Sequence, residues 1–290
     1  MDSRERAVLK TLLYSNFFDY PLTEAEIYKF LITDQKIGKK DFHKLLKKLK
    51  EPIRSREDFY FLTGRNGLVR IRKEREKISL QKMQKAKRII GILSFIPTIK
   101  LIGISGALSM GNCDKDDDVD VFVITEKNFV WTTRFLMAIL LLILGVYRNK
   151  NSKNYSDKIC LNMLLDESKM SLEKNLYIAH EITQLIPVFG RDNVYKQFLQ
   201  KNKWVEDFMV NALDDNRNYL EKKISVIDHA LISLFKLFAF ETIMRFLQQR
   251  YMKKDITNEI IGNDVLRLHP FNYGHSILQK YNKKLKEFKL

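Results

Sequence analysis

The chain has 290 residues, of which 45% are hydrophobic, and its low Pro and Gly content excludes a largely disordered protein. Its net charge of +16 favours polyanionic partners such as nucleic acid or an anionic membrane surface, although the lysine bias of an AT-rich genome would produce the same excess. The two cysteines exclude a disulfide framework and, with no secretory signal after Met1, predict a reducing, cytoplasmic setting.

Residues 1–72 predict three helices followed by a hairpin. The helices are expected over 4–15, 24–32 and 40–50, with Thr23 and Glu26 forming a capping box before the second. Strands at 56–62 and 68–71 are expected to flank a turn at 64–67. This order of elements is that of a winged helix, which would be a nucleic-acid-binding domain or only a packing module. In the first case Arg65 would contact the nucleic-acid backbone, and the third helix would offer basic residues to a groove: Lys39, Lys40, His43, Lys44, Lys47 and Lys48.

Residues 73–97 predict a long connecting helix that ends at Pro97. Its apolar positions recur at helical spacing and are expected to face inward. Its basic residues are expected to cover the outside, namely Lys77, Lys82, Lys85, Lys87 and Arg88.

The segment 99–125 carries the chemistry. A predicted strand at 99–104 runs into a turn containing Gly106 and Gly111, and a polar loop then leads to Asp118, Asp120 and a second strand at 119–125. Alternation along a strand directs the two carboxylates to the same face, where a cation between them would offset their repulsion. Such hard oxygen ligands suit Mg²⁺, and the glycines allow backbone N–H groups to approach phosphates. The segment therefore predicts metal-dependent nucleotide chemistry.

This pattern resembles the nucleotidyltransferase (polymerase beta-like) superfamily, in which a Gly-Ser turn and a spacer precede an Asp-apolar-Asp strand. The resemblance covers roughly residues 99–165. It implies transfer of a nucleoside monophosphate from a nucleoside triphosphate (NTP) to a hydroxyl or phosphate, with Mg²⁺ held by Asp118 and Asp120. It also implies that the turn residues hold the phosphates, namely Ser105, Gly106, Ala107, Ser109 and Gly111.

Two departures from the superfamily pattern bear on catalysis. Ala107 stands where the superfamily has the serine that touches the phosphates. The third carboxylate is expected on the strand 158–165, which offers Asn162 instead, with Asp157 and Asp166 at its two ends as alternatives. An amide cannot accept a proton, so the sequence identifies no certain base.

An apolar run at 135–147 lies within a predicted helix, 129–147. Because it is shorter than the roughly 20 residues of a spanning helix, a buried helix is expected and a membrane is an unlikely partner. Contact with a membrane surface through this segment and the lysines is a third, minor reading.

From residue 171 the chain is expected to be wholly helical, with breaks at Pro187, Gly190, Asp214-Asp215 and Pro270. The predicted helices are 171–185, 191–201, 203–212, 216–250 and 272–288. The apolar stripe within 219–250 is expected to be core. His180-Glu181 and Arg191-Asp192 are candidates to approach the site, or residues that cap or pair structurally.

The sequence therefore predicts an α+β protein with a nucleotidyltransferase-like mixed sheet. Its expected parts are a winged-helix-like domain at 1–72, a connecting helix at 73–97, a core at 98–168 and a helical domain at 169–290. The expected function is Mg²⁺-dependent transfer from an NTP to an unknown acceptor. The alternative is a non-catalytic nucleotide- or nucleic-acid-binding regulator, which Ala107 and Asn162 favour and the Asp118–Asp120 pair opposes.

Overall fold

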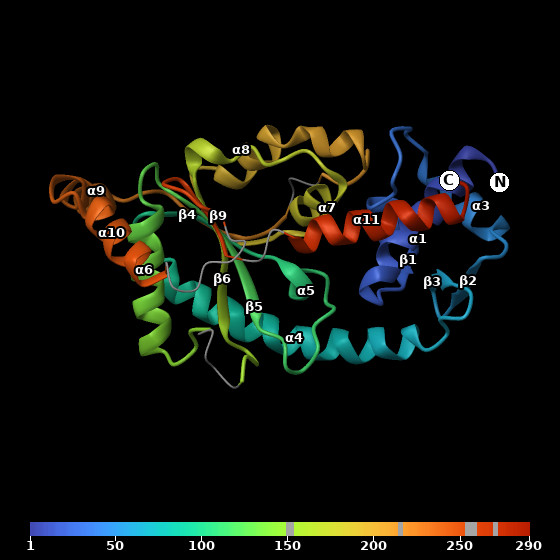
Figure 1. Ribbon diagram of the computed structural model, residues 1–290, viewed down its shortest axis with the longest axis horizontal. Coiled ribbons are helices and arrows are strands. Elements are labelled where there is room, and N and C mark those ends of the chain that lie inside the picture. The colour runs from blue at the N-terminus through green and yellow to red at the C-terminus, as the bar shows by residue number, and fades with distance from the viewer. Residues whose placement is uncertain (149–153, 214–216, 253–259, 269–271) are drawn as a thin grey trace.

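The computed structural model describes residues 1–148, 154–213, 217–252, 260–268 and 272–290. It is an α+β structure in which an N-terminal unit with a small sheet lies at one end of a larger unit with a mixed sheet (Figure 1). Helix α4 (Leu68–Leu93) runs from the first unit along the second. In the part of the chain that is described, none of the helices has both the length and the apolar character needed to cross a membrane.

The N-terminal unit confirms the three predicted helices. These are α1 (Ser3–Ser15), α2 (Glu24–Lys29) and α3 (Lys39–Lys48), and they pack around one apolar core. The capping box is also confirmed: the Thr23 hydroxyl accepts from the Glu26 backbone N–H, and the Glu26 carboxylate accepts from that of Thr23. Three short strands complete the unit in the order β1-β3-β2, namely β1 (Leu22–Thr23), β2 (Ile53–Arg56) and β3 (Phe59–Leu62).

The hairpin of this unit lies earlier in the chain than predicted. Strands β2 and β3 pair antiparallel around Glu57 and Asp58, which both have positive φ as tight hairpin turns require. The predicted turn at 64–67 instead precedes α4, and residues 68–71 are helical rather than a strand. The segment after Gly67 continues with helix-favouring residues for seven turns, so the connecting helix begins at Leu68.

Within the described residues the larger unit contains a seven-stranded sheet in the order β8-β7-β4-β5-β6-β10-β9. Strands β4 (Ile99–Ile104) and β5 (Val119–Thr125) confirm the two strands predicted there. Strand β4 pairs antiparallel with β5, and β5 pairs parallel with β6 (Ile159–Asp166). The core strands have apolar side chains on both faces because helices cover both sides of the sheet.

The expectation that the chain is wholly helical after residue 171 is wrong. Strand β7 (Ile186–Arg191) pairs with β4, and three further strands extend the sheet: β8 (Leu220–Lys222), β9 (Ile260–Ile261) and β10 (Val265–Arg267). Both predicted breakers lie inside β7. Pro187 falls where the register with β4 shifts, and a Cβ at Gly190 would collide with the ring of Tyr219. The predicted breaks at 214–215 and 270 lie outside the described residues.

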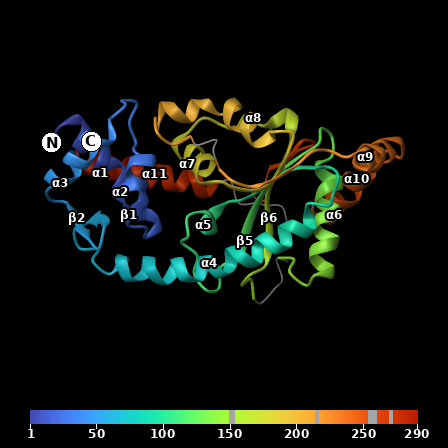
Figure 2. The same cartoon turned by 180° about the vertical axis from the view of Figure 1, so that it is seen from behind.

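Helices cover the two faces of this sheet (Figures 1 and 2). On one face lie α4, α6 (Val130–Ile143) and α10 (Phe240–Met252), and on the other lie α7 (Leu176–Gln184) and α8 (Val194–Lys201). The remaining helical elements are α5 (Gly106–Ser109), α9 (Val226–Leu237), α11 (Asn272–Glu287), η1 (Asn16–Phe18), η2 (Glu167–Lys169) and η3 (Lys203–Asp207).

The C-terminal helix α11 belongs to the core of the N-terminal unit. Its Ile277 and Tyr281 are buried against α1, and the Tyr281 hydroxyl donates to the Lys10 carbonyl at 3.2 Å. The two chain termini therefore lie close together in both views (Figures 1 and 2). Residues of the region 169–290 therefore pack in the cores of both units.

The apolar stripe expected to be core in 219–250 is mostly exposed. The chain turns at Ala239, whose φ is +48°, so the predicted single helix becomes α9 and α10. Each helix buries one inward face through Ile232 or Met244. Their outward apolar side chains are exposed, as is the C-terminal end of α6, including Leu142 and Ile143.

Candidate functional site

The two predicted carboxylates lie together at the start of β5. A carboxylate oxygen of Asp118, one of Asp120 and the Sγ of Cys160 all lie within 4.8 Å of one another. The parallel pairing of β5 and β6 sets Cys160 directly beside Asp120. The prediction that both carboxylates lie on one side of the sheet is therefore confirmed, with a thiol as their neighbour.

Arg148 supplies positive charge to this group. Its Nε lies 2.8 Å from Asp118 Oδ2, and its Nη1 donates to Cys160 Sγ at 3.0 Å. The neighbouring Tyr147 bridges to Ile159 at the start of β6, which brings Arg148 back to the sheet after α6. Burial alone would lower the pKa of Arg148, but Cys160, Asp118 and Asp120 outweigh it and raise the pKa. The sequence showed this arginine only as the boundary of an apolar run.

The donor set fits a hard divalent cation. Carboxylate oxygens are the ligands that Mg²⁺ prefers, whereas thiolates suit softer metals. Burial, followed by the charge of Asp120, raises the pKa of Cys160 well above its usual value, so the thiol stays neutral at pH 7. Asp118 and Asp120 are thus the residues that would hold Mg²⁺, and Cys160 adds no negative charge.

The turn after β4 fits closely against Asp120. The Ser105 backbone N–H donates to the Asp120 carbonyl at 3.0 Å, and Gly106 has a φ of +62°. A Cβ on Gly106 would collide with the Asp120 carboxylate, so glycine allows the turn to approach the site. Ser105, Gly106 and Ala107 line the cavity described below.

The other two predicted phosphate-binding residues have structural contacts. The Ser109 hydroxyl donates to the Gly106 carbonyl at 2.8 Å and closes the short α5 turn. Gly111 has a φ of +65° in the following turn. Neither residue contributes to the lining of the cavity.

The loop between α5 and β5 is anchored to α4. Arg75 binds both oxygens of Asp114, at 3.0 and 2.8 Å. Lys82 is only 3% exposed, and its Nζ donates to the carbonyls of Lys115 and Asp117 and to Asp157. The expectation that Lys82 covers the outside of its helix is therefore wrong. Its side chain is buried because the carbonyls of the loop before Asp118 accept its hydrogen bonds, and these bonds hold that loop in place.

Replacing Lys82 with methionine is expected to destabilise the protein by about 3 kcal/mol, because buried carbonyl oxygens lose their donor. Lys87→Met, at an exposed position on the same helix, should change stability by no more than about 0.5 kcal/mol. Urea unfolding of both variants measures the difference. Equal stabilities would show that Lys82 does not anchor the loop.

The third acidic position is not filled by the predicted residues. Asn162 lines the cavity near Asp120, as expected, but the register shifts after Val121, and Cys160 is the residue paired with Asp120. Asp166 pairs with Thr125 at the far end of β5 and accepts hydrogen bonds from Asn128 and Ser168.

Asp157 also serves the anchored loop. Burial alone would raise the pKa of Asp157, but hydrogen bonds from Lys85 and Lys82 outweigh burial and lower it. It is therefore held as a structural anion beside α4.

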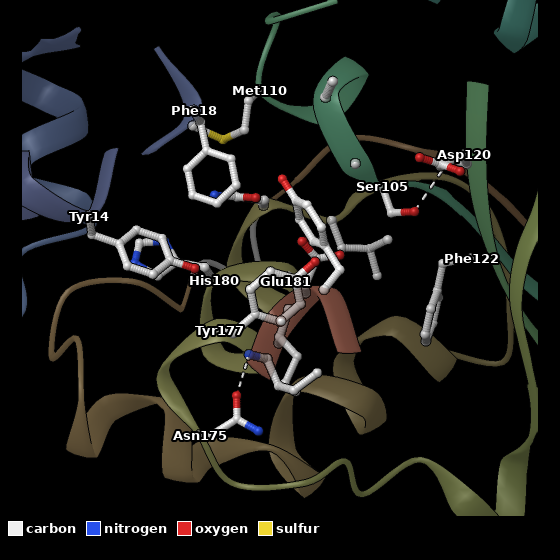
Figure 3. Close-up of a pocket in the computed structure, with 18 of the residues that line it drawn as sticks. Tyr14, Phe18, Ser105, Met110, Asp120, Phe122, Asn175, Tyr177, His180 and Glu181 are labelled. Atoms are coloured by element: carbon white, nitrogen blue, oxygen red, sulfur yellow. Dashed lines mark hydrogen bonds between the residues drawn. The ribbon is translucent and has the colours of Figure 1, made fainter. Parts of the chain in front are cut away.

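A large cavity extends from Asp120 toward the N-terminal unit (Figure 3), and Asp118 is not among the residues that line it. It encloses about 1050 Å³, at the upper end of the roughly 300–1000 Å³ usual for small-molecule sites. Asp120 and Ser105 lie at one end and Tyr14 and His180 at the other, with Glu181 between them. Its walls are largely apolar, and their aromatic side chains include Tyr14, Phe18, Phe30, Phe122, Tyr177, Phe198 and Tyr273.

His180 is a buried neutral base in the wall of this cavity. Its ring stacks on that of Tyr14 at 4.0 Å, and neither ring nitrogen has a hydrogen-bond partner among the described residues. Burial lowers the pKa of His180 to about 3. The structure therefore brings His180 and Glu181, which the sequence offered as candidates, to the cavity. The other candidate pair does not line it, because Arg191 is paired with Asp228 and Asp192 with Lys100.

The low pKa of His180 predicts a loss of stability in mild acid. In the unfolded chain His180 is protonated below about pH 6.5, whereas in the folded chain it stays neutral down to about pH 3. The free energy of unfolding therefore falls as the pH drops below 6.5. Between pH 7 and pH 5 this effect of His180 should lower the free energy of unfolding by about 2 kcal/mol. His180→Phe should remove this part of the pH dependence in denaturant titrations, whereas the exposed His229→Gln should retain it. Identical pH profiles for wild type and His180→Phe would contradict the assignment.

Comparison of the chain with family models, with curated proteins and with solved structures found no match.

Proposed function

We propose that this protein is a Mg²⁺-dependent nucleotidyltransferase that moves a nucleoside monophosphate from an NTP to an acceptor bound in the cavity. The observation that carries the proposal is the convergence of Asp118 and Asp120, with Asp120 against the Gly106 turn at one end of a large cavity. This combination supports the resemblance of residues 99–165 to the polymerase beta-like superfamily. The antiparallel β4–β5 pair and the parallel β6 neighbour fit the same reading.

Each part of the site has a distinct role in this proposal. Asp118 and Asp120 hold the metal, and Ser105 and the backbone that follows Gly106 bind the phosphates. A bound Mg²⁺ would neutralise charge on the triphosphate and polarise the transferred phosphoryl group. Arg148 adds a cation that balances the two carboxylates and favours a polyanionic substrate.

The cavity wall indicates the kind of acceptor. The cavity wall is largely apolar and includes several aromatic rings, so the acceptor has an apolar or ring-shaped body and carries its hydroxyl toward Asp120. Besides Glu173, which also lines the cavity, the acidic side chain of Glu181 lies between the two ends (Figure 3). It is the group that would accept the acceptor's proton in this arrangement.

The N-terminal unit is proposed to be a winged helix. Three helices and the sheet β1-β3-β2 support this topology, and the basic side chains of α3 are exposed as nucleic-acid contact would require. This surface and the departures at Ala107 and Asn162 favour the second candidate, a nucleotide-responsive regulator that binds nucleic acid. Burial of α11 in the same unit supports a structural link between that unit and the cavity.

Incubation with each of four α-labelled NTPs tests the proposal. The protein, Mg²⁺ and a panel of hydroxyl-bearing acceptors are combined, and labelled product and pyrophosphate are measured. Metal-dependent release of pyrophosphate that is lost in Asp120→Asn supports the enzyme. Tight NTP binding without any release, together with binding to a DNA panel, supports the regulator instead.

The third position gives a separate prediction. Cys160→Asp places a third carboxylate next to Asp118 and Asp120, so it should lower the melting temperature of the metal-free protein and raise Mg²⁺ affinity by about tenfold. Asn162→Asp, two residues further along β6 at the register shift, should have a smaller effect. Calorimetric titration with Mg²⁺ distinguishes them. A larger gain in Mg²⁺ affinity for Asn162→Asp would show that Asn162 holds the third position and that the pairing of Cys160 with Asp120 does not identify it.

A further inference from the structure

The end of the molecule remote from the N-terminal unit carries an unusual surface. Helices α9 and α10 form a hairpin there (Figures 1 and 2), and the large exposed apolar side chains of the described chain concentrate on it. We call this set the end surface. It consists of Val226, Ile227, Leu231, Leu234, Leu237, Phe238, Ile243, Phe246, Leu247 and Tyr251.

The end surface is an ordered stripe on each helix. On α9 the residues Ile227, Leu231 and Leu234 follow the spacing of one helical face, and on α10 Ile243 and Phe246 begin a second stripe. Helices packed on a core ordinarily present polar residues outward, yet these helices have an apolar face on each side. A contiguous exposed apolar surface of this kind marks a contact with another phase or molecule.

The charges around the end surface are positive. The two acids within 226–252 are both turned inward. Asp228 caps α9 and lies 3.1 Å from Arg191, and Glu241 accepts from the backbone N–H groups of Trp131 and Thr132 at the start of α6. The charged residues left exposed on the hairpin are basic, namely Lys236 and Arg250.

We infer that the end surface binds peripherally to an anionic phospholipid bilayer. Apolar helix faces that insert at the boundary between headgroups and acyl chains, with basic residues beside them, are the pattern of interfacial helices. A second copy of the chain would bring a surface of the same positive charge to the contact, which favours a dimer less than an anionic surface. This inference goes beyond the proposed function and does not depend on it. It needs no spanning segment, so it is compatible with the short apolar run at 135–147.

Sedimentation with lipid vesicles tests the inference. The whole protein is mixed with vesicles of phosphatidylcholine containing phosphatidylglycerol, or of phosphatidylcholine alone, at low and high salt. We expect binding to the anionic vesicles at low salt and at least about tenfold weaker binding to the neutral ones. Ile227→Glu with Phe246→Glu should abolish binding. The matched control is Leu80→Glu with Phe95→Glu, whose positions are 66% and 76% exposed against 73% and 62% for the test pair, and it should bind as wild type does.

Two results would overturn the inference. One is equal sedimentation of wild type and the Ile227→Glu, Phe246→Glu variant with anionic vesicles, since general basic charge would then explain the binding. The other is a dimer in analytical ultracentrifugation that this variant dissociates, since a second copy would then cover the end surface. Circular dichroism of each variant confirms that these exposed substitutions leave the fold intact.

Discussion

Replacing both Asp118 and Asp120 with asparagine is expected to weaken Mg²⁺-dependent NTP binding by more than about a hundredfold. Loss of a residue that only hydrogen-bonds a metal ligand costs about ten- to a hundredfold in metal affinity, and these two residues are the ligands themselves. Both carboxylates belong to the cluster that lies within 4.8 Å, so the double variant removes all its ionised ligands. Transfer should fall below detection. Calorimetric titration with Mg²⁺ and a non-hydrolysable NTP measures the change.

The fold of this variant should survive. Loss of the ion pair between Asp118 and Arg148 offsets relief of the repulsion between the two carboxylates, so stability should change by no more than about 1 kcal/mol. Asp116→Asn, which changes an exposed carboxylate in the same loop, is the control that should leave metal affinity unchanged. Unchanged nucleotide and metal affinity in the double variant would place the site elsewhere.

Gly106→Ala should impair the site through Asp120. An alanine at a φ of +62° costs about 1–2 kcal/mol in backbone strain, and its Cβ would also displace the Asp120 carboxylate. We therefore expect lower stability together with at least about tenfold weaker Mg²⁺ binding, because a ligand moves. Thermal unfolding and metal titration measure the two effects separately.

Gly111→Ala is the matched control for this prediction. Gly111 has a similar φ of +65°, but its added Cβ would meet only Glu76 Cγ, at 4.0 Å. It should show the strain without the loss of metal affinity. If both variants lost metal affinity equally, backbone strain in the turn would explain the loss. The close approach of Gly106 to Asp120 would then not be its cause.

The parts of the site that local sequence determines were predictable. Alternation in a short apolar strand is enough to put Asp118 and Asp120 on one side, and the Gly106 turn follows directly from the strand before it. Cys160 and Arg148 were not predictable, because the pairing of β5 with β6 and the return of the chain after α6 bring them in. Tertiary pairing of this kind leaves no local pattern.

Two larger errors have a common physical cause. Pro187 and Gly190 are ordinary helix and strand breakers, but a register shift accommodates the first and the ring of Tyr219 occupies the space beside the second. The outward stripe of α9 was expected to be core because spacing cannot tell which of two apolar faces meets the protein. In both cases the elements that pack against the segment, and not its own sequence, determine whether it is a strand or a helix and which of its faces is buried.

A crystal structure with Mn²⁺ and a non-hydrolysable NTP tests the central claim most directly, because manganese is located by its anomalous scattering. We predict a manganese peak bonded to carboxylate oxygens of both Asp118 and Asp120, with the triphosphate beside the Gly106 turn. A nucleotide bound elsewhere, or manganese that contacts neither carboxylate, would contradict the account.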